Sequence, residues 1–332
     1  MEIISFALRG NYKRFYNDLK TISKKNGKSP FLMFSDTVLS TLFLGSGMQD
    51  YLNYRFYERS WKERKEYATI GYLSKFYEKA ANIKYAPFIS TKTNFFKNYG
   101  EFTKRDMYDP EDGYNKFLEF IKKHKVFIKK PTIGLGGDGI TKVETKQIKN
   151  TKKFYKEIKE NKMYLEEFII QNKDWGKINP GSVNTIRVMT SAINGKVDIF
   201  FMAARIGHGD SVVDNFHAGG LSTLIDIEKG ILKGPGYTKK LEKSNVHPLT
   251  KVVIDGYKIP YFEEIKEMVT KAALVNDKIH IVGWDVAITD KGPLIIEGNR
   301  GPGWDLVQIL LNKGGKYMLR KIEKEMKDHN LW

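Results

Sequence analysis

Residues 283–299 have the sequence Gly283-Trp284-Asp285-Val286-Ala287-Ile288-Thr289-Asp290-Lys291-Gly292-Pro293-Leu294-Ile295-Ile296-Glu297-Gly298-Asn299. Apolar and β-branched residues dominate on both sides of 289–292, where Thr, Asp, Lys and Gly form a sequence typical of a turn. The pattern predicts a β-hairpin with strands at 279–288 and 294–297.

This hairpin brings three oxygen-bearing side chains together. Glu297 and Asn299 are two positions apart on one strand, so they project from the same face. Asp285 lies on the partner strand, where its side chain can meet theirs. Two carboxylates and a carboxamide form an all-oxygen set that suits Mg²⁺. The alternative is a pair of strand-end carboxylates that bind Arg300 or lysines.

A glycine-rich loop at 134–139 lies further upstream and contains Gly136, Gly137 and Gly139. Although it formally satisfies G-x-G-x-x-G, the residues that follow alternate like a strand instead of opening a helix, which argues against a dinucleotide-binding fold. A loop between two strands can lie over a triphosphate and offer backbone N–H groups. Lys129 or Lys130 precedes it and can reach phosphate. The alternative is a hairpin tip with incidental lysines.

The remaining chain alternates between helical and strand patterns. Residues 1–85 are predicted to be mainly helical, and the apolar stretch at 39–44 is interpreted as a buried helix, with membrane contact as the alternative. Strands are expected at 184–192 and 197–206 around an Asn194-Gly195 turn, and a helix at 261–275. We therefore expect an α+β protein with boundaries at 1–85, 86–175 and 176–332.

Composition limits the function classes. The chain has 332 residues, no cysteine and a net charge of +17, from 56 Lys and Arg against 39 Asp and Glu. The absence of cysteine excludes disulfides, thiolate metal sites and cysteine nucleophiles. The charge attracts anions, although a lysine-rich solvated surface is an equally weighted explanation. No signal peptide and no apolar run of roughly 20 residues is evident, so we expect a cytoplasmic location, with the inner face of the membrane as a further option.

Several segments together resemble the ATP-grasp superfamily, and most of all its sugar-transfer-associated group. The lysine and glycine-loop hairpin, the segment Tyr164-Leu165-Glu166-Glu167-Phe168-Ile169 and the three predicted metal ligands match in type and order. Asn184-Thr185-Ile186-Arg187-Val188 and His217-Ala218-Gly219-Gly220 resemble the sugar-transfer group. The resemblance implies two α+β lobes that clamp ATP, two Mg²⁺ ions and an acyl-phosphate mechanism.

The resemblance also implies roles for individual residues. Lys130 would hold the α- and β-phosphates, with Lys92 as an earlier lysine, and Gly136, Gly137 and Gly139 would cover the β- and γ-phosphates. Adenine would meet the backbone of Glu166, Glu167, Phe168 and Ile169. Arg187 and Arg205 are candidates for neutralising the transferring phosphoryl group, or else form structural ion pairs. Other candidates are Asn215 near the phosphates, His217 as a base or a hydrogen-bonding loop residue, and Asp174 or Gln171 for ribose.

The function implied is an ATP- and Mg²⁺-dependent, ADP-forming carboxylate–amine ligase. Its substrates would be a sugar-linked or small-molecule carboxylate and an amine, in polysaccharide biosynthesis. One alternative is a phosphotransferase that modifies a glycan hydroxyl with the same site. Another is a basic, anion-binding protein without catalysis. No nucleic-acid module is recognisable, so nucleic acid is not an expected partner, whereas peripheral contact with an anionic membrane is compatible with a ligase.

Overall fold

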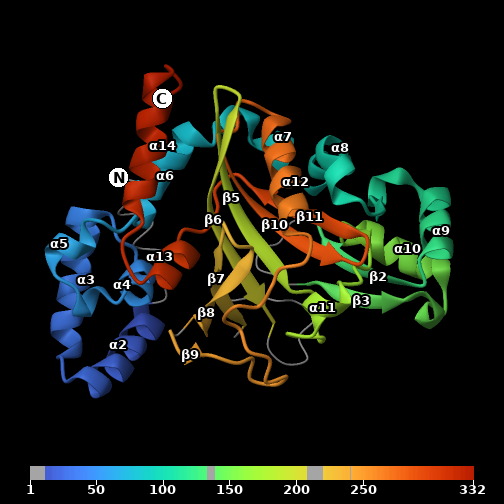
Figure 1. Ribbon diagram of the computed structural model, residues 1–332. Coiled ribbons are helices and arrows are strands. Elements are labelled where there is room, and N and C mark those ends of the chain that lie inside the picture. Colours follow the sequence, from blue (N-terminus) through green and yellow to red (C-terminus); the bar gives the residue numbers. More distant parts are fainter. Residues whose placement is uncertain (1–11, 133–138, 208–219, 240) are drawn as a thin grey trace. The chain divides into compact units, whose positions relative to one another are not determined.

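The computed structural model describes residues 12–132, 139–207, 220–239 and 241–332 (Figure 1). The chain forms two compact units, one of Met1–Ile83 with Gly303–Trp332 and one of Lys84–Pro302. The C-terminal segment 303–332, which the sequence analysis grouped with the preceding lobe, thus belongs with the N-terminal helices. Helices and mostly antiparallel strands confirm the predicted α+β class.

The first unit is helical, as predicted for residues 1–85. Its elements are α2 (Tyr12–Asn26), α3 (Pro30–Leu44), α4 (Met48–Asn53), η1 (Phe56–Glu58), α5 (Trp61–Arg64), α6 (Ile70–Ala80), α13 (Asp305–Leu311) and α14 (Lys316–Asp328). Tyr51, Tyr54 and Phe56 are buried in its core, so the aromatic residues pack inward. The chain turns at Arg55, whose φ is 54°, and starts η1 there.

The prediction that the apolar stretch at 39–44 is a buried helix is wrong. Leu39, Leu42 and Phe43 on α3 are 45%, 66% and 75% exposed. The helix turns the polar residues Thr37 and Ser40 inward instead, and both are buried. None of the helices in the described part of the chain is both long and apolar enough to cross a membrane.

The second unit contains two antiparallel sheets, the smaller in the order β1-β4-β2-β3. Its strands are β1 (Met107–Tyr108), β2 (Val126–Pro131), β3 (Thr141–Glu144) and β4 (Met163–Glu167), with α9 (Tyr114–Lys123), η3 (Pro110–Asp112), η4 (Thr145–Gln147) and α10 (Thr151–Glu160). Phe117, Phe127, Ile158 and Leu165 join these elements in one core. The strand that follows the glycine loop confirms the strand–loop–strand prediction.

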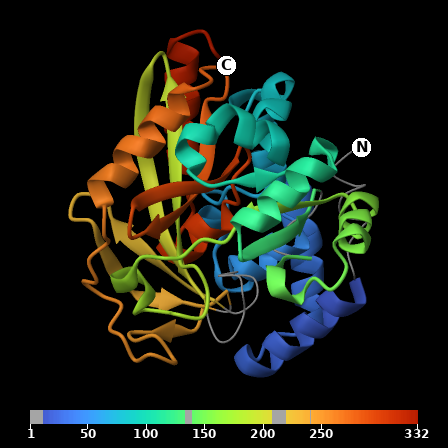
Figure 2. The same cartoon turned by 90° about the vertical axis from the view of Figure 1, so that its right-hand side faces the viewer.

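The larger sheet has seven strands in the order β11-β10-β5-β6-β7-β8-β9. Its strands are β5 (Thr185–Ile193), β6 (Lys196–Ile206), β7 (Leu221–Asp226), β8 (Ile231–Tyr237), β9 (Lys243–Ser244), β10 (Ile281–Thr289) and β11 (Gly292–Asn299). η2 (Ile83–Tyr85), α7 (Ala86–Ser90), α8 (Lys92–Thr103), α11 (Lys173–Gly176) and α12 (Phe262–Leu274) complete the unit. The predicted β5–β6 turn has positive φ at Asn194 (49°) and Gly195 (74°), and α12 packs against the sheet (Figure 2).

The register of the large sheet positions the site. Asp285 on β10 lies opposite Glu297 on β11 and opposite Arg187 on β5. Arg187 in turn lies opposite Ala203 on β6, two positions before Arg205. Because residues directly opposite share a face, and residues two apart on a strand also share it, all four charged side chains project from one face.

Gly298 provides a test of how β11 is held. A Cβ at this position would lie 2.7 Å from Cδ1 of Ile89, 3.0 Å from the Trp284 ring and 3.1 Å from the Phe95 ring. We expect Gly298→Ala to lower the free energy of unfolding by about 1–3 kcal/mol because the strand is already closely packed. Gly100→Ala is the control, since that Cβ meets nothing within 4 Å; equal losses in denaturant titrations of both variants would contradict the packing.

Candidate ATP and magnesium site

Asp285 is the most enclosed charge of the site. It is 3% exposed, and Arg187 binds it through two bonds, from Nε to Oδ1 at 2.6 Å and from an Nη to Oδ2 at 3.1 Å. An Nη of Arg205 lies 3.4 Å from the same Oδ2. Burial by itself would raise the pKa of Asp285, but the charges of Arg187 and Arg205 outweigh it and hold the pKa below its ordinary value. Asp285 is therefore ionised at neutral pH.

Glu297 and Asn299 occupy the open side of this group. Asn299 donates from Nδ2 to Oε1 of Glu297 at 3.3 Å, and the Glu297 side chain also hydrogen-bonds Asp285. Glu297 remains exposed to solvent at one side. Loss of hydration where the carboxyl faces protein, and then the negative charge of Asp285, raise the pKa of Glu297. The two carboxylates thus repel each other unless a proton or a cation lies between them.

The donor set fits a hard divalent cation. Of the four lone-pair positions of the Asp285 carboxylate, Arg187 takes two and Arg205 approaches a third. The fourth is the one that Glu297 contacts, where a cation could replace the shared proton. Glu297 and Asn299 supply further oxygens from the same edge, and Mg²⁺ accepts such a partial protein set with water or phosphate completing it. The alternative partners, Arg300 or lysines, are not those observed: Asp285 pairs with Arg187 and Arg205.

Lys130 lies near this edge and is fixed by a buried acid. Its Nζ lies 2.9 Å from Oε2 of Glu166, whose side chain is 5% exposed. Burial opposes ionisation of Glu166, but Lys130 and Arg105 together lower its pKa to about 2. Lys129 points to the other side of the strand, where it pairs with Glu157 at 2.8 Å. The structure therefore distinguishes the two lysines: Lys130 is held by Glu166, within the same cluster of charges as Lys92.

Lys92 joins the same cluster from the start of α8. Its Nζ donates to the carbonyl oxygen of Pro131 at 2.9 Å and lies 4.7 Å from the centre of the Tyr164 ring. Burial, and then the positive charge of Lys130, lower its pKa, while Glu166 and Glu297 act in the opposite direction. Five cationic side chains surround three carboxylates here, so the surroundings favour an anionic ligand.

Arg105 was not predicted from the sequence. Its guanidinium binds Oε2 of Glu166 at 3.2 and 3.3 Å and donates to the carbonyl oxygens of Ile295 at 2.8 Å and Ile296 at 2.9 Å. One buried side chain thus ties the partner of Lys130 to the strand that carries Glu297. Arg105 lies between α8 and β1 in a segment without a motif. No spacing in the sequence relates it to Glu166 and Ile295, which are 61 and 190 positions further along the chain.

The glycine and loop residues are only partly described. Gly139 has a φ of 76°, and a Cβ there would lie 3.3 Å from the Pro131 ring, so Gly139 itself lies close to the end of β2. Gly136, Gly137, Asn215 and His217 lie outside the described residues. Their predicted roles therefore stay predictions.

The segment proposed to bind adenine leaves β4 and continues without regular structure. Glu167 pairs through its backbone with Asp106, and the Phe168 ring lies 4.8 Å from Nζ of Lys142.

The two candidates for binding ribose differ in how their side chains are engaged. Gln171 is engaged with Asn179, Ser182 and Asn184, whereas Asp174 is largely exposed and pairs with Lys177 at 2.6 Å. Gln171 thus stabilises the loop before β5. Ile169, the last residue of the segment proposed to bind adenine, is half-buried.

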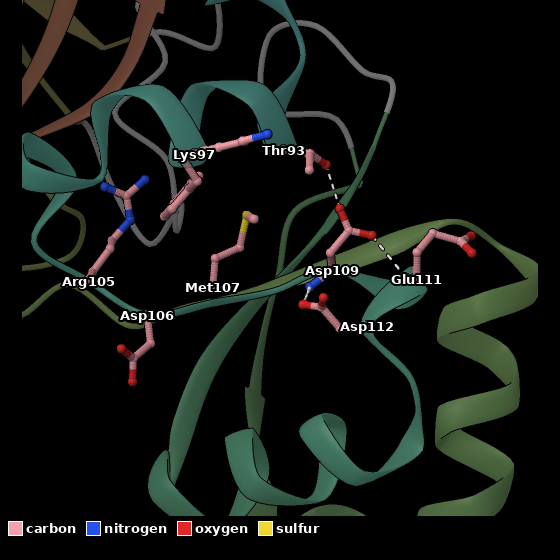
Figure 3. A pocket seen from close by; sticks show the side chains of 9 residues that line it. Thr93, Lys97, Arg105, Asp106, Met107, Asp109, Glu111 and Asp112 are labelled. Atoms are coloured by element: carbon pink, nitrogen blue, oxygen red, sulfur yellow. Dashed lines mark hydrogen bonds between the residues drawn. The ribbon is translucent and has the colours of Figure 1, made fainter.

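A second group of acids lies on the small sheet, away from Glu297. Atoms of Asp106, His124 and Glu167 lie within 4.8 Å of one another, but Lys123 also pairs with Asp106 and already supplies a positive charge. An open pocket of about 640 Å³ borders it, and of the charged groups around Asp285, Glu297 and Lys130 described above only Arg105 lines it (Figure 3). Asp109 there binds Thr93 and the backbone of Glu111. These carboxylates are engaged in local contacts.

Two of the three predicted metal ligands, Glu297 and Asp285, should have opposite effects on stability without metal. Glu297 has a raised pKa, so its stabilising contribution is present at acidic pH and is lost as pH rises through its folded pKa. At neutral pH, Glu297→Gln should therefore raise the free energy of unfolding, by at most about 1 kcal/mol because the side chain is exposed. Asp285→Asn should lower it by about 3–5 kcal/mol, since Arg187 and Arg205 lose a buried partner.

Thermal unfolding in EDTA from acidic to neutral pH measures both effects. The gain from Glu297→Gln should shrink at acidic pH, where the wild-type carboxyl is itself protonated. If both substitutions destabilised equally, the repulsion between Asp285 and Glu297 would be refuted.

Comparison with known proteins gives a family. The sequence profile described as "Sugar-transfer associated ATP-grasp" matches residues 89–324, more than half of the chain. This match confirms the predicted resemblance and the ATP-grasp fold. No curated protein sequence matches the chain.

Solved structures with a similar fold share little sequence with the chain. The ATP-grasp ligase PsnB, complexed with precursor peptide PsnA2 and AMPPNP, is 15% identical with a TM-score of 0.45, covering 84% of this chain and 74% of that one. N5-carboxyaminoimidazole synthetase from Staphylococcus aureus, complexed with ADP, is 11% identical with a TM-score of 0.41, covering 65% and 46%. From the profile match we conclude that the chain belongs to the sugar-transfer associated ATP-grasp family.

Proposed function

We propose that the protein is an ADP-forming carboxylate–amine ligase that uses Mg²⁺ and ATP and acts on a saccharide-linked or small-molecule carboxylate. The observation that carries the proposal is the cross-strand group of Asp285 and Glu297 with Asn299, faced by Lys92 and Lys130. Its oxygens suit a divalent cation and its lysines suit phosphate. Mg²⁺ held there would offset charge on the transferring phosphoryl group.

The side chains of the chain would serve binding and charge stabilisation. Lys130, fixed by Glu166, and Lys92 would bind phosphate oxygens. Arg187 and Arg205 have N–H groups beyond those used on Asp285 and would stabilise negative charge as it develops. A substrate carboxylate oxygen would bond to the γ-phosphorus as the bond to ADP breaks. The amine would then attack the acyl carbon, and phosphate would leave as the amine loses a proton.

The remaining roles predicted from the sequence belong to the same proposal. Gly136, Gly137 and Gly139 would cover the phosphates, with Asn215 nearby. The backbone of 166–169 would meet adenine, and Asp174 would be the ribose acid, since Gln171 is occupied by the loop before β5. His217 would be a base or a hydrogen-bonding residue. The family description, sugar-transfer associated, supports a saccharide substrate and a place in polysaccharide biosynthesis.

Product analysis tests the reaction class. The protein should release ADP and phosphate from Mg-ATP only when a matching carboxylate and amine from a panel of sugar acids, amino acids and amines are both present. Mass spectrometry should find an amide. AMP release would contradict the acyl-phosphate route, and an acid-stable phosphate ester would indicate a phosphotransferase.

Glu297→Gln should reduce kcat about 100-fold or more, because a charged metal ligand is replaced by a neutral one. Glu144→Gln, on β3 of the small sheet, is the matched control and should retain turnover within a few-fold. Steady-state ADP release at saturating Mg²⁺ measures both. Near-normal turnover of the Glu297 variant would remove this residue from the site.

Lys130→Met should raise KM for ATP by at least about 30-fold, the equivalent of about 2 kcal/mol, since a partly buried phosphate-binding charge that Glu166 holds in place is lost. Lys129→Met removes the same charge from the opposite side of the same strand and should change KM less than about 3-fold. Equal effects of the two substitutions in nucleotide-binding titrations would show that only the overall charge matters.

A further inference from the structure

Helix α3 (Pro30–Leu44) exposes a continuous apolar face, defined by Phe31, Leu32, Val38, Leu39, Leu42 and Phe43. These side chains are between 45% and 75% exposed. At 3.6 residues per turn the six positions fall within an arc of roughly 140°, in which Ser35 is the one polar residue, so they form one stripe along the helix. Trp61, 38% exposed, extends the stripe through its contact with Phe43, with ring centres 6.4 Å apart.

The opposite face of α3 carries its polar residues into the protein. Asp36 forms two bonds with the buried Arg64, at 2.7 and 2.8 Å, and accepts a third from the hydroxyl of Tyr51 at 2.8 Å. Ser40 accepts from Arg64 as well. A surface helix normally turns its apolar face to the core and its polar face to water. In α3 the inner side combines apolar residues such as Met33 with these polar ones, the outer side is also apolar, and the inward ion pair fixes this orientation.

Exposed lysines lie next to both ends of the stripe. Lys24 and Lys25 lie in the last turn of α2, and Lys28 precedes Phe31 by three residues. At the other end, Lys62 follows Trp61, and Lys65 lies in the next turn. An apolar face with an aromatic residue and a basic margin is the combination that binds the interface of an anionic bilayer.

We propose that α3 docks the protein onto an anionic lipid surface, with its axis in the plane of the membrane. With 15 residues the helix is too short to span a bilayer, which needs roughly 20. Its apolar stripe enters the boundary between headgroups and acyl chains, and the flanking lysines bind phosphate headgroups. A second copy of the chain is a poorer occupant, because pairing two such faces symmetrically brings their lysines together.

Sedimentation of the full chain with vesicles tests the proposal. The protein should bind phosphatidylcholine vesicles that contain one third phosphatidylglycerol, and bind pure phosphatidylcholine much less. Phe31→Ser with Leu42→Ser should weaken binding about tenfold or more, because the apolar stripe is interrupted. Lys25→Gln with Lys62→Gln should reduce the preference for anionic vesicles. Leu249→Ser with Val253→Ser changes two equally exposed apolar residues outside α3 and should leave binding unchanged.

Vesicle binding and sedimentation velocity distinguish membrane docking from the other possible occupants of the α3 face. Binding that persists in the Phe31 and Leu42 variant would overturn the proposal in favour of general charge attraction. Absence of vesicle binding would overturn it too. Sedimentation velocity without lipid then identifies the other occupant: dissociation of a dimer by the same substitutions indicates a second copy. If the Phe31 and Leu42 variant is monomeric and its Tm is lower than that of the wild type, another segment of the same chain covers the apolar stripe of α3. ATP turnover without vesicles is independent of all these outcomes.

Discussion

The Asp285 carboxylate is buried between two arginines of neighbouring strands while a second carboxylate, Glu297, lies against it on the outer side. This arrangement sets the character of the site. The arginines keep Asp285 ionised, and the resulting charge disfavours ionisation of Glu297. A divalent cation removes that conflict without changing the fold, so a strained pair of acids becomes a set of ligands. The register of four neighbouring strands, β11, β10, β5 and β6, suffices to build it.

Lys130, the proposed phosphate-binding lysine, is connected to the same edge through one residue. Arg105 binds Glu166, which holds Lys130, and it also binds two carbonyl oxygens of the strand that carries Glu297. A shift of either sheet would therefore break buried charge-assisted bonds, which are expensive to leave unmade. Arg105 thus explains how groups from two separate sheets can keep a fixed spacing around one nucleotide.

The sequence predicted what local patterns determine. Alternation and an Asn-Gly turn located the strands, and direct pairing across a hairpin placed Asp285 beside Glu297. Arg105 could not be found this way, because its partners are distant in sequence and its segment has no periodicity. The sequence pattern also could not predict which side of α3 faces solvent, because the helix is apolar on most sides. The pairing of Asp36 with Arg64 decides which side faces the protein. Tertiary ion pairs explain both cases.

The metal site is tested most directly by diffraction from crystals grown with Mn²⁺ and a non-hydrolysable ATP analogue, with data collected to reveal the anomalous signal of manganese. The account predicts anomalous density within about 2.1 Å of oxygen atoms of Asp285, Glu297 and Asn299. Manganese at Asp106, His124 and Glu167 instead, with none beside Glu297, would contradict it.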